Sequence, residues 1–144
     1  MDDKLKKYES DELNQKIDKD LEISLVDLER QMSTLPRRMY RYVQMAAKQR
    51  VRVADAEREL KKIRGDRFLF YIGKHPDKVS PTIYEKSELK TIMDADPEIH
   101  QAEELVDRRK AHLFQMEGAI DAMKNRSYMF KNLIEWHKFK NGDI

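Results

Sequence analysis

The stretch that decides the fold runs from Asp96 to Gly142 and reads DPEIHQAEELVDRRKAHLFQMEGAIDAMKNRSYMFKNLIEWHKFKNG. Side chains in it form a series with alternating spacings of three and four residues. The members are Ile99, Ala102, Val106, Arg109, Leu113, Met116, Ile120, Met123, Ser127, Phe130, Ile134 and His137, of which only Arg109, Ser127 and His137 are polar. This period predicts a single helix of roughly 60 Å with a coiled-coil-like seam. Asp96 is placed to cap this helix, and Pro97 fits its first turn.

Two further helices are predicted in the N-terminal half. The first runs from Ser10, as N-cap, to Met32, and its apolar stripe is Leu13, Ile17, Leu21, Leu25, Leu28 and Met32. We expect Ser33-Thr34-Leu35-Pro36 to end it, because proline fits only the first turn of a helix. The second runs from Pro36 to near Ile72, with Gly73 just beyond its end. Its stripe is Met39, Tyr42, Ala46, Val53, Ala56, Leu60 and Ile63, interrupted by Gln49.

The remaining segments complete an all-α prediction. A short helix is expected from about Tyr84 to Met93, and the composition of Phe68–Ile72 leaves a short strand there as an alternative. Charged residues make up 39% of the chain, which has only 4 glycines and 4 prolines, so long helices suit it better than a thick sheet core. We expect one elongated helical domain over residues 1–144. It divides into an antiparallel helical hairpin over residues 1–78 and the short and long helices over residues 79–144.

The C-terminal end of the long helix is predicted to mediate self-association. Phe114, Met129, Leu133, Trp136 and Phe139 widen its apolar surface beyond what one partner helix covers. The alternative is a purely intramolecular core. The predicted oligomerisation residues are Leu113, Met116, Ile120, Met123, Phe130, Leu133, Ile134 and Trp136.

Catalytic and cofactor motifs are absent from the sequence, so no enzyme, cofactor or metal site is predicted. No glycine-rich phosphate loop occurs, and the four histidines have neither an H-E-x-x-H spacing nor cysteine companions. The first residues contain no apolar leader, and no run is long enough to cross a membrane. A cytoplasmic location without membrane contact is therefore expected.

Charge points to a polyanionic partner. Residues 37–78 hold 13 basic and 5 acidic side chains, whereas the whole chain has a net charge of only +2. Cations follow phosphates and aromatic rings stack on bases, so basic-aromatic clusters are typical of sequence-independent single-strand binding. The alternative is a solvated helix face whose cations pair with neighbouring acids, with Phe68 and Phe70 as core residues. The candidate nucleic-acid-binding residues are Lys61, Lys62, Arg64, Arg67, Tyr71 and Lys74, with a second cluster of Arg37, Arg38 and Arg41.

Three segments resemble the UvsY family of phage recombination mediators. They are Tyr84–Thr91 with Ala95-Asp96, the segment Gly118–Arg126, and Arg67 followed by Tyr71, Gly73 and Lys74. The resemblance covers roughly residues 60–140. It implies that Arg67 matches a DNA-contacting arginine, whereas the family's partner lysine falls on Gly65, so that Arg64, Lys62 or Lys61 would have to replace it.

The resemblance implies a helical, non-catalytic protein that forms ring-like homo-oligomers through its C-terminal helix. Such a protein binds single-stranded DNA and helps a RecA-like recombinase nucleate on strands covered by single-strand-binding protein. This would take place in phage DNA recombination, repair and recombination-dependent replication, in the cytoplasm of the infected host. Two rival hypotheses are a helical scaffold or adaptor assembled through the long helix, and a regulator of a nucleic-acid enzyme that binds duplex DNA.

Overall fold

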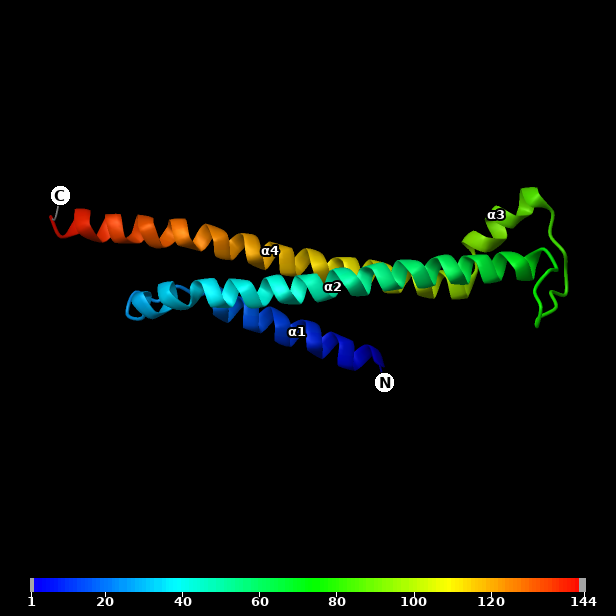
Figure 1. The fold of residues 1–144 in the computed structure, drawn as a ribbon, viewed down its shortest axis with the longest axis horizontal. Coiled ribbons are helices and arrows are strands. Elements are labelled where there is room, and N and C mark those ends of the chain that lie inside the picture. The colour runs from blue at the N-terminus through cyan, green and yellow to red at the C-terminus, as the bar shows by residue number, and fades with distance from the viewer. Residues whose placement is uncertain (1, 143–144) are drawn as a thin grey trace. The chain divides into compact units, whose positions relative to one another are not determined.

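Four helices make up the part of the chain that the computed structural model describes, residues 2–142, with side chains described from residue 11 onward. They are α1 (Asp2–Leu21), α2 (Leu28–Tyr71), α3 (Lys86–Asp94) and α4 (Pro97–Lys140) (Figure 1). No strand occurs within residues 2–142, which confirms the all-α prediction. None of the helices described there has the length and apolar character needed to cross a membrane.

The long helices α2 and α4 each contribute to two compact units. Unit 1 contains the residues up to Ala46 and those from Gln115 onward, and unit 2 contains Ala47–Phe114. Unit 1 therefore joins two segments that lie far apart in the sequence, and unit 2 is one continuous stretch between them, whereas the predicted division at residues 78 and 79 cuts the chain once. The single elongated domain stays a prediction.

Unit 1 is built around side chains from α1, the first half of α2 and the second half of α4. Its buried cluster comprises Leu35, Tyr42, Ala119, Met123 and Phe130, and half-buried residues such as Ile17, Leu21 and Met39 pack against it. The Tyr42 hydroxyl donates a hydrogen bond to Asp20 Oδ2 at 2.7 Å, which ties α2 to α1. Burial of these stripes stabilises helices of such high charge content, because helix propensity alone supplies little.

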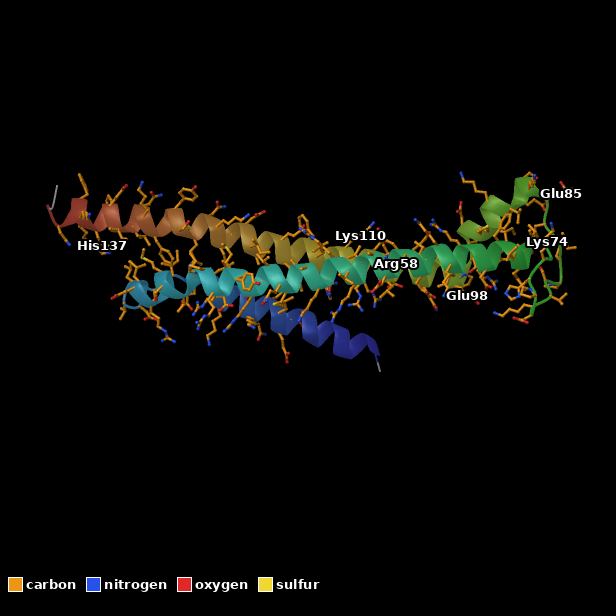
Figure 2. All side chains as sticks on the ribbon, viewed as in Figure 1. Arg58, Lys74, Glu85, Glu98, Lys110 and His137 are labelled. Atoms are coloured by element: carbon orange, nitrogen blue, oxygen red, sulfur yellow. The ribbon has the colours of Figure 1, made fainter. Side chains whose placement is uncertain are left out.

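Unit 2 pairs the second half of α2 with the first half of α4, and α3 joins them. Its buried apolar residues are Val53, Ala56, Leu89, Ile99, Ala102 and Val106. Gln49, which interrupts the predicted stripe, is buried and donates from Nε2 to the Arg109 carbonyl at 3.3 Å. Lys110 pairs with Glu57 at 3.1 Å, and Arg64 pairs with Glu103, so the two segments run antiparallel. Figure 2 shows Arg58 on α2 and Lys110 on α4 in this unit.

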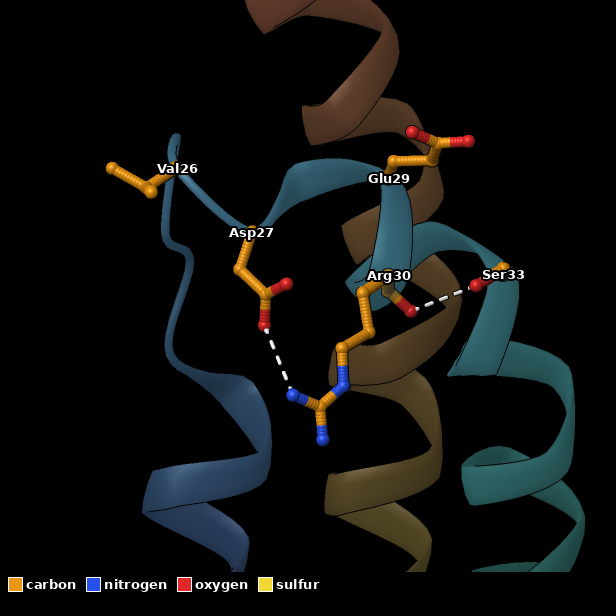
Figure 3. Close-up of a pocket in the computed structure, with 5 residues that line it drawn as sticks. All are labelled: Val26, Asp27, Glu29, Arg30 and Ser33. Atoms are coloured by element: carbon orange, nitrogen blue, oxygen red, sulfur yellow. Dashed lines mark hydrogen bonds and ion pairs between the residues drawn. The ribbon is translucent and has the colours of Figure 1, made fainter.

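The first break in the helical chain lies at residues 22–27 and not at the predicted Ser33–Pro36. The Gln31 side chain fixes the turn: its Oε1 accepts from the Ser24 N–H at 3.1 Å, and its Nε2 donates to the Glu22 carbonyl at 3.1 Å. Asp27 pairs with Arg30 at 3.8 Å in the same turn (Figure 3). The predicted start at Ser10 was also wrong, because α1 begins at Asp2 and Ser10 lies inside it.

Pro36 lies inside α2, well beyond its first turn. Proline lacks an N–H, so the Met32 carbonyl loses its helical donor there. The buried Leu35 and half-buried Met39 anchor both sides of this position in the core of unit 1, which favours continuation of the helix. The hydroxyls of Ser33 and Thr34 donate to the Arg30 carbonyl at 3.0 and 2.8 Å, and such bonds to the preceding turn are typical of Ser and Thr inside a helix, which they often bend.

Replacing Pro36 with alanine is expected to raise the free energy of unfolding by about 1–3 kcal/mol, because the alanine N–H can bond to the Met32 carbonyl. Urea denaturation followed by circular dichroism measures the difference. Pro81→Ala is the matched control, since Pro81 lies outside the helices and is exposed. An unchanged or lower stability of Pro36→Ala would show that the proline does not strain α2.

The end of α2 and the start of α4 follow the sequence prediction. Gly73 has φ +73°, the conformation that commonly ends a helix. Its N–H donates to the Phe70 carbonyl at 3.2 Å, and the Lys74 N–H donates to the Leu69 carbonyl at 2.9 Å. The strand alternative for Phe68–Ile72 was wrong, because α2 continues through Tyr71. At α4, Asp96 caps the helix and Pro97 is its first residue, as predicted. The short helix α3 begins at Lys86, two residues later than expected.

The buried face of α4 departs from the predicted seam toward the C-terminus. Ser127 and His137 are exposed, whereas Ala119 and Arg126 are buried. Figure 2 places His137 near the end of α4. Ala119 and Arg126 each lie one residue before a predicted seam position, in the half of α4 that belongs to unit 1, where Arg126 also contacts the end of α1.

Candidate nucleic-acid interface

The predicted basic-aromatic cluster of unit 2 divides into an exposed and an enclosed part. Lys61, Lys62 and Lys74 are exposed, and within the described residues their side chains make no ion pair. Arg64 pairs with Glu103, and 51% of its side chain remains accessible. These four cations lie on the last turns of α2 and directly after it, so they form an accessible basic surface.

Arg67 and Tyr71 are enclosed with the carboxylate of Asp96. Arg67 Nε donates to Asp96 Oδ2 at 2.7 Å, and the Tyr71 hydroxyl donates to the same oxygen at 2.5 Å. The Arg67 guanidinium also lies 4.3 Å from the centre of the Phe70 ring and 3.7 Å from Glu98. Only 13% of the Arg67 side chain and none of the Asp96 side chain is accessible. We call Arg67, Tyr71 and Asp96 the Asp96 network.

Asp96 also satisfies the first backbone donors of α4. Its Oδ1 accepts from the N–H groups of Glu98 at 2.8 Å and Ile99 at 3.1 Å. One carboxylate therefore joins the end of α2 to the beginning of α4 through four hydrogen bonds. Such a group holds the two helices together at this point, because every lone pair it buries has a donor.

The protonation equilibria in the Asp96 network favour the ion pair. Burial opposes ionisation of Asp96, but hydrogen bonds from Tyr71, Arg67 and the Ile99 N–H outweigh it and lower the pKa of Asp96. Burial and the hydrogen bond to Asp96 raise the pKa of Tyr71. The pKa of Arg67 is raised as well: burial acts against this, while its hydrogen bonds with Tyr71 and Asp96 outweigh the burial.

The second predicted cluster lies in unit 1. Arg37 and Arg41 are exposed, and Arg38 is half-buried with Asp20 at 3.9 Å. Arg38 and Arg41 line a cavity of about 170 Å³ together with Lys16, Asp20, Tyr42 and Met45. Sequence reasoning missed Lys16, which lies one helical turn before Asp20 on the side of α1 that meets α2. Burial and the hydrogen bond to Asp20 raise the pKa of Tyr42.

Arg126 is a second residue that sequence reasoning missed. It is 2% exposed and donates to the backbone carbonyls of Asp20 and Glu22. These carbonyls lie at the C-terminal end of α1, where helical donors are missing and a cation is favoured. Burial, and then the nearby charge of Arg38, lower the pKa of Arg126. Apart from its place at the end of the segment Gly118–Arg126, its sequence signal is its position one residue from the predicted seam.

The predicted oligomerisation residues differ in accessibility. Met116, Met123 and Phe130 are buried within the protomer, and Leu113, Ile120, Leu133 and Ile134 are half-buried. Trp136 is 59% exposed, and its ring stacks on that of Phe139 with centroids 5.8 Å apart. Their role in assembly stays a prediction. Of this set, Trp136 is accessible without any change in the protomer core.

Comparison with known proteins identifies a family whose model matches the chain and solved structures that share its fold. A family model described as "Recombination, repair and ssDNA binding protein UvsY" matches residues 13–143. A crystal structure of the bacteriophage T4 recombination mediator protein UvsY superposes with a TM-score of 0.83 at 23% identity, covering 91% of this chain and 96% of that chain. A second crystal lattice of the same protein gives 0.82 at 23% identity, covering 90% and 98%. No match is found among the curated proteins.

Proposed function

The chain belongs to the UvsY family of recombination, repair and single-stranded-DNA-binding proteins, and on that premise we propose that it is a non-catalytic recombination mediator. In this proposal it binds single-stranded DNA and helps a RecA-like recombinase load onto strands covered by single-strand-binding protein. It acts as a homo-oligomer, as a ring, on phage DNA in the cytoplasm of the infected cell. The family match over residues 13–143 is the observation that carries the proposal.

Direct phosphate contacts fall to the exposed cations. We assign them to Lys61, Lys62, Arg64 and Lys74 in unit 2, with Arg37, Arg38 and Arg41 as a second set in unit 1. Arg67 and Tyr71 act from within the Asp96 network, since a phosphate would have to displace a carboxylate that already holds both side chains. They position the end of α2, from which the exposed lysines project. Each subunit contributes only a weak contact to the DNA. In an oligomer, once one subunit has bound the strand, the others meet it at a high effective concentration, so the overall affinity increases.

Binding of a fluorescent single-stranded oligonucleotide, measured by anisotropy over increasing salt, tests the proposal. We expect salt-sensitive binding that prefers the single strand over a matched duplex. Equal affinity for both would favour a duplex-binding regulator instead. A complete lack of binding at low salt would favour a helical scaffold, for which the exposed Trp136 and Phe139 are the supporting observation.

Replacing Lys61, Lys62 and Lys74 together with alanine is expected to weaken single-strand binding by more than about tenfold at low salt. The slope of log affinity against log salt should flatten by about 0.7 for each phosphate that the protein no longer neutralises. The matched control replaces Lys78, Lys86 and Lys90, which are also exposed and lie in the same unit. If both triple variants bound the single strand equally weakly, the cluster would have no special role beyond net charge.

A further inference from the structure

The cavity that α1 and α2 line in unit 1 is mostly cationic, and we call it the α1–α2 cavity. Its lining residues are Lys16, Asp20, Arg38, Arg41, Tyr42 and Met45, and its volume is about 170 Å³. Spacings of four residues on α1 and three on α2 place the charged members on adjacent turns of each helix. A water molecule takes ~30 Å³ of the liquid, so the cavity has room for about five waters. A single tetrahedral oxyanion therefore fits in it.

The carboxylate of Asp20 neutralises only part of the charge in this cavity. Its Oδ2 accepts from the Tyr42 hydroxyl at 2.7 Å, and its Oδ1 lies 3.9 Å from Arg38 Nη1. That distance is too long for a hydrogen bond, so within the described residues the donors of Arg38 have no acceptor, although only 30% of its side chain is accessible. Lys16 and Arg41 make no ion pair with any described residue. Three cations therefore face one acid.

A fourth cation, Arg126, increases the positive charge near Asp20. Its two Nη atoms donate to the backbone carbonyls of Asp20 and Glu22, which carry no net charge, and its buried Nε has no partner among the described residues. Burial is the first cause that lowers the pKa of Arg126, and the charge of Arg38 is the second. The cations at this place therefore repel one another, and an anion in the cavity would offset the repulsion.

The surplus of two positive charges among the lining residues distinguishes between kinds of phosphate. An internal phosphate of a DNA strand carries one negative charge. A phosphate monoester carries about −1.5 to −2 at pH 7 and has three terminal oxygens that accept hydrogen bonds. Guanidinium groups bind such oxygens through charge-assisted, often bidentate, hydrogen bonds. A continuous strand would also have to enter and leave a cavity of this size, whereas a terminal group has only to enter it.

We propose that the α1–α2 cavity binds a phosphate monoester. Arg38 and Arg41 donate to its oxygens, and Lys16 supplies the third positive charge. The terminal phosphate of a DNA strand and the free phosphate ion present the same group, and only the first of these sources rests on the proposed function. The site goes beyond that function, because the accessible basic surfaces contact phosphates inside a strand. A phosphate held by both helices also stabilises unit 1, since it binds the folded state.

Inorganic phosphate tests the site without DNA. The melting temperature of the full chain, recorded over increasing phosphate at constant ionic strength and pH, gives an apparent Kd. We expect Lys16→Ala and Arg41→Ala each to raise this Kd by about tenfold, the factor for one charge-assisted hydrogen bond. The matched control is Lys19→Ala, because Lys19 is exposed, lies on α1 and does not line the cavity. It should keep the wild-type Kd, and it also reports any general effect of the salt.

Asp20→Asn gives a result of the opposite sign. Asparagine keeps an acceptor for the Tyr42 hydroxyl but removes the negative charge that opposes an anion, so phosphate should bind more tightly than to the wild type. A purely structural role of Asp20 would not strengthen phosphate binding. Asp18→Asn is the matched control, since Asp18 is an exposed acid of the same helix outside the cavity. An equal gain in both variants would mean that net charge alone determines the affinity, and would overturn the site.

Two oligonucleotides of one sequence, with a 5′-phosphate or a 5′-hydroxyl and a fluorophore at the 3′ end, identify the source of the phosphate. A preference for the phosphorylated strand that Lys16→Ala loses would assign the end of a strand. Stabilisation by inorganic phosphate without that preference would assign the free ion. The absence of both effects, or an equal loss in Lys19→Ala, would overturn the proposal. Affinity for the 5′-hydroxyl strand tests the proposed function separately, because that ligand has no terminal phosphate.

Discussion

Replacing Asp96 with alanine is expected to lower the free energy of unfolding by about 3–5 kcal/mol, the range for removing one partner of a buried ion pair. The substitution leaves Arg67 enclosed without its carboxylate and Tyr71 without its acceptor. It also deprives the N–H groups of Glu98 and Ile99 of their cap. Chemical denaturation of the full chain measures the loss.

Asp94→Ala is the matched control for this prediction. Asp94 lies two residues earlier, is exposed, and should cost less than about 0.5 kcal/mol. A double-mutant cycle with Tyr71→Phe then separates the hydrogen bond to tyrosine from the ion pair to Arg67. Similar small losses for Asp94→Ala and Asp96→Ala would contradict the assignment of Asp96 as the joint between α2 and α4.

The pKa of Asp96 adds a pH dependence with a defined sign. Its folded-state pKa lies below the ordinary aspartate value of 3.8. The unfolded state therefore binds a proton first as the pH falls, and the contribution of Asp96 to stability is fully present above that ordinary value. The contribution decreases as the pH falls further and passes the folded-state pKa. In the Asp96→Ala variant, the stability difference from wild type should shrink over this acidic range.

Local signals in the sequence predicted the helix ends that depend on neighbouring residues. The capping of α4 by Asp96 and Pro97 and the end of α2 at Gly73 each need only a few consecutive residues. The break after α1 depends instead on Gln31, whose side chain reaches back seven and nine residues to backbone groups of the turn. A glutamine inside a predicted helix carries no such signal, and Pro36 carried a stronger but misleading one.

The candidate interface was predictable by composition but not by orientation. Arg67 follows Ile63 by four residues, so the stripe of α2 directs it inward rather than toward solvent. Its partner Asp96 is 29 residues away and was predicted only as a helix cap. The cavity residue Lys16 comes from α1, whose packing against Arg38 and Tyr42 depends on the tertiary fold. Pairings between distant segments are the part that a single sequence does not specify.

Replacing Phe130 with alanine is expected to destabilise the protomer by about 3–5 kcal/mol, the range for emptying a large aromatic site in a core. Phe130 is 1% exposed and belongs to the buried cluster of unit 1 with Tyr42 and Met123. Trp136→Ala, in contrast, removes a side chain that is 59% exposed and should change unfolding by less than about 1 kcal/mol. Denaturation curves, recorded beside the oligomer mass, separate the two effects.

The comparison of Phe130→Ala with Trp136→Ala shows which apolar residues of α4 stabilise the protomer and which contribute to assembly. Helix α4 has one face in the protomer core and another, with Trp136 and Phe139, outside it. If the assignment is correct, Trp136→Ala lowers the oligomer mass while the protomer remains stable, and Phe130→Ala lowers stability first. A Phe130→Ala variant that keeps wild-type stability but no longer forms the oligomer would instead place Phe130 between subunits, and α4 would then have to leave the core when copies associate.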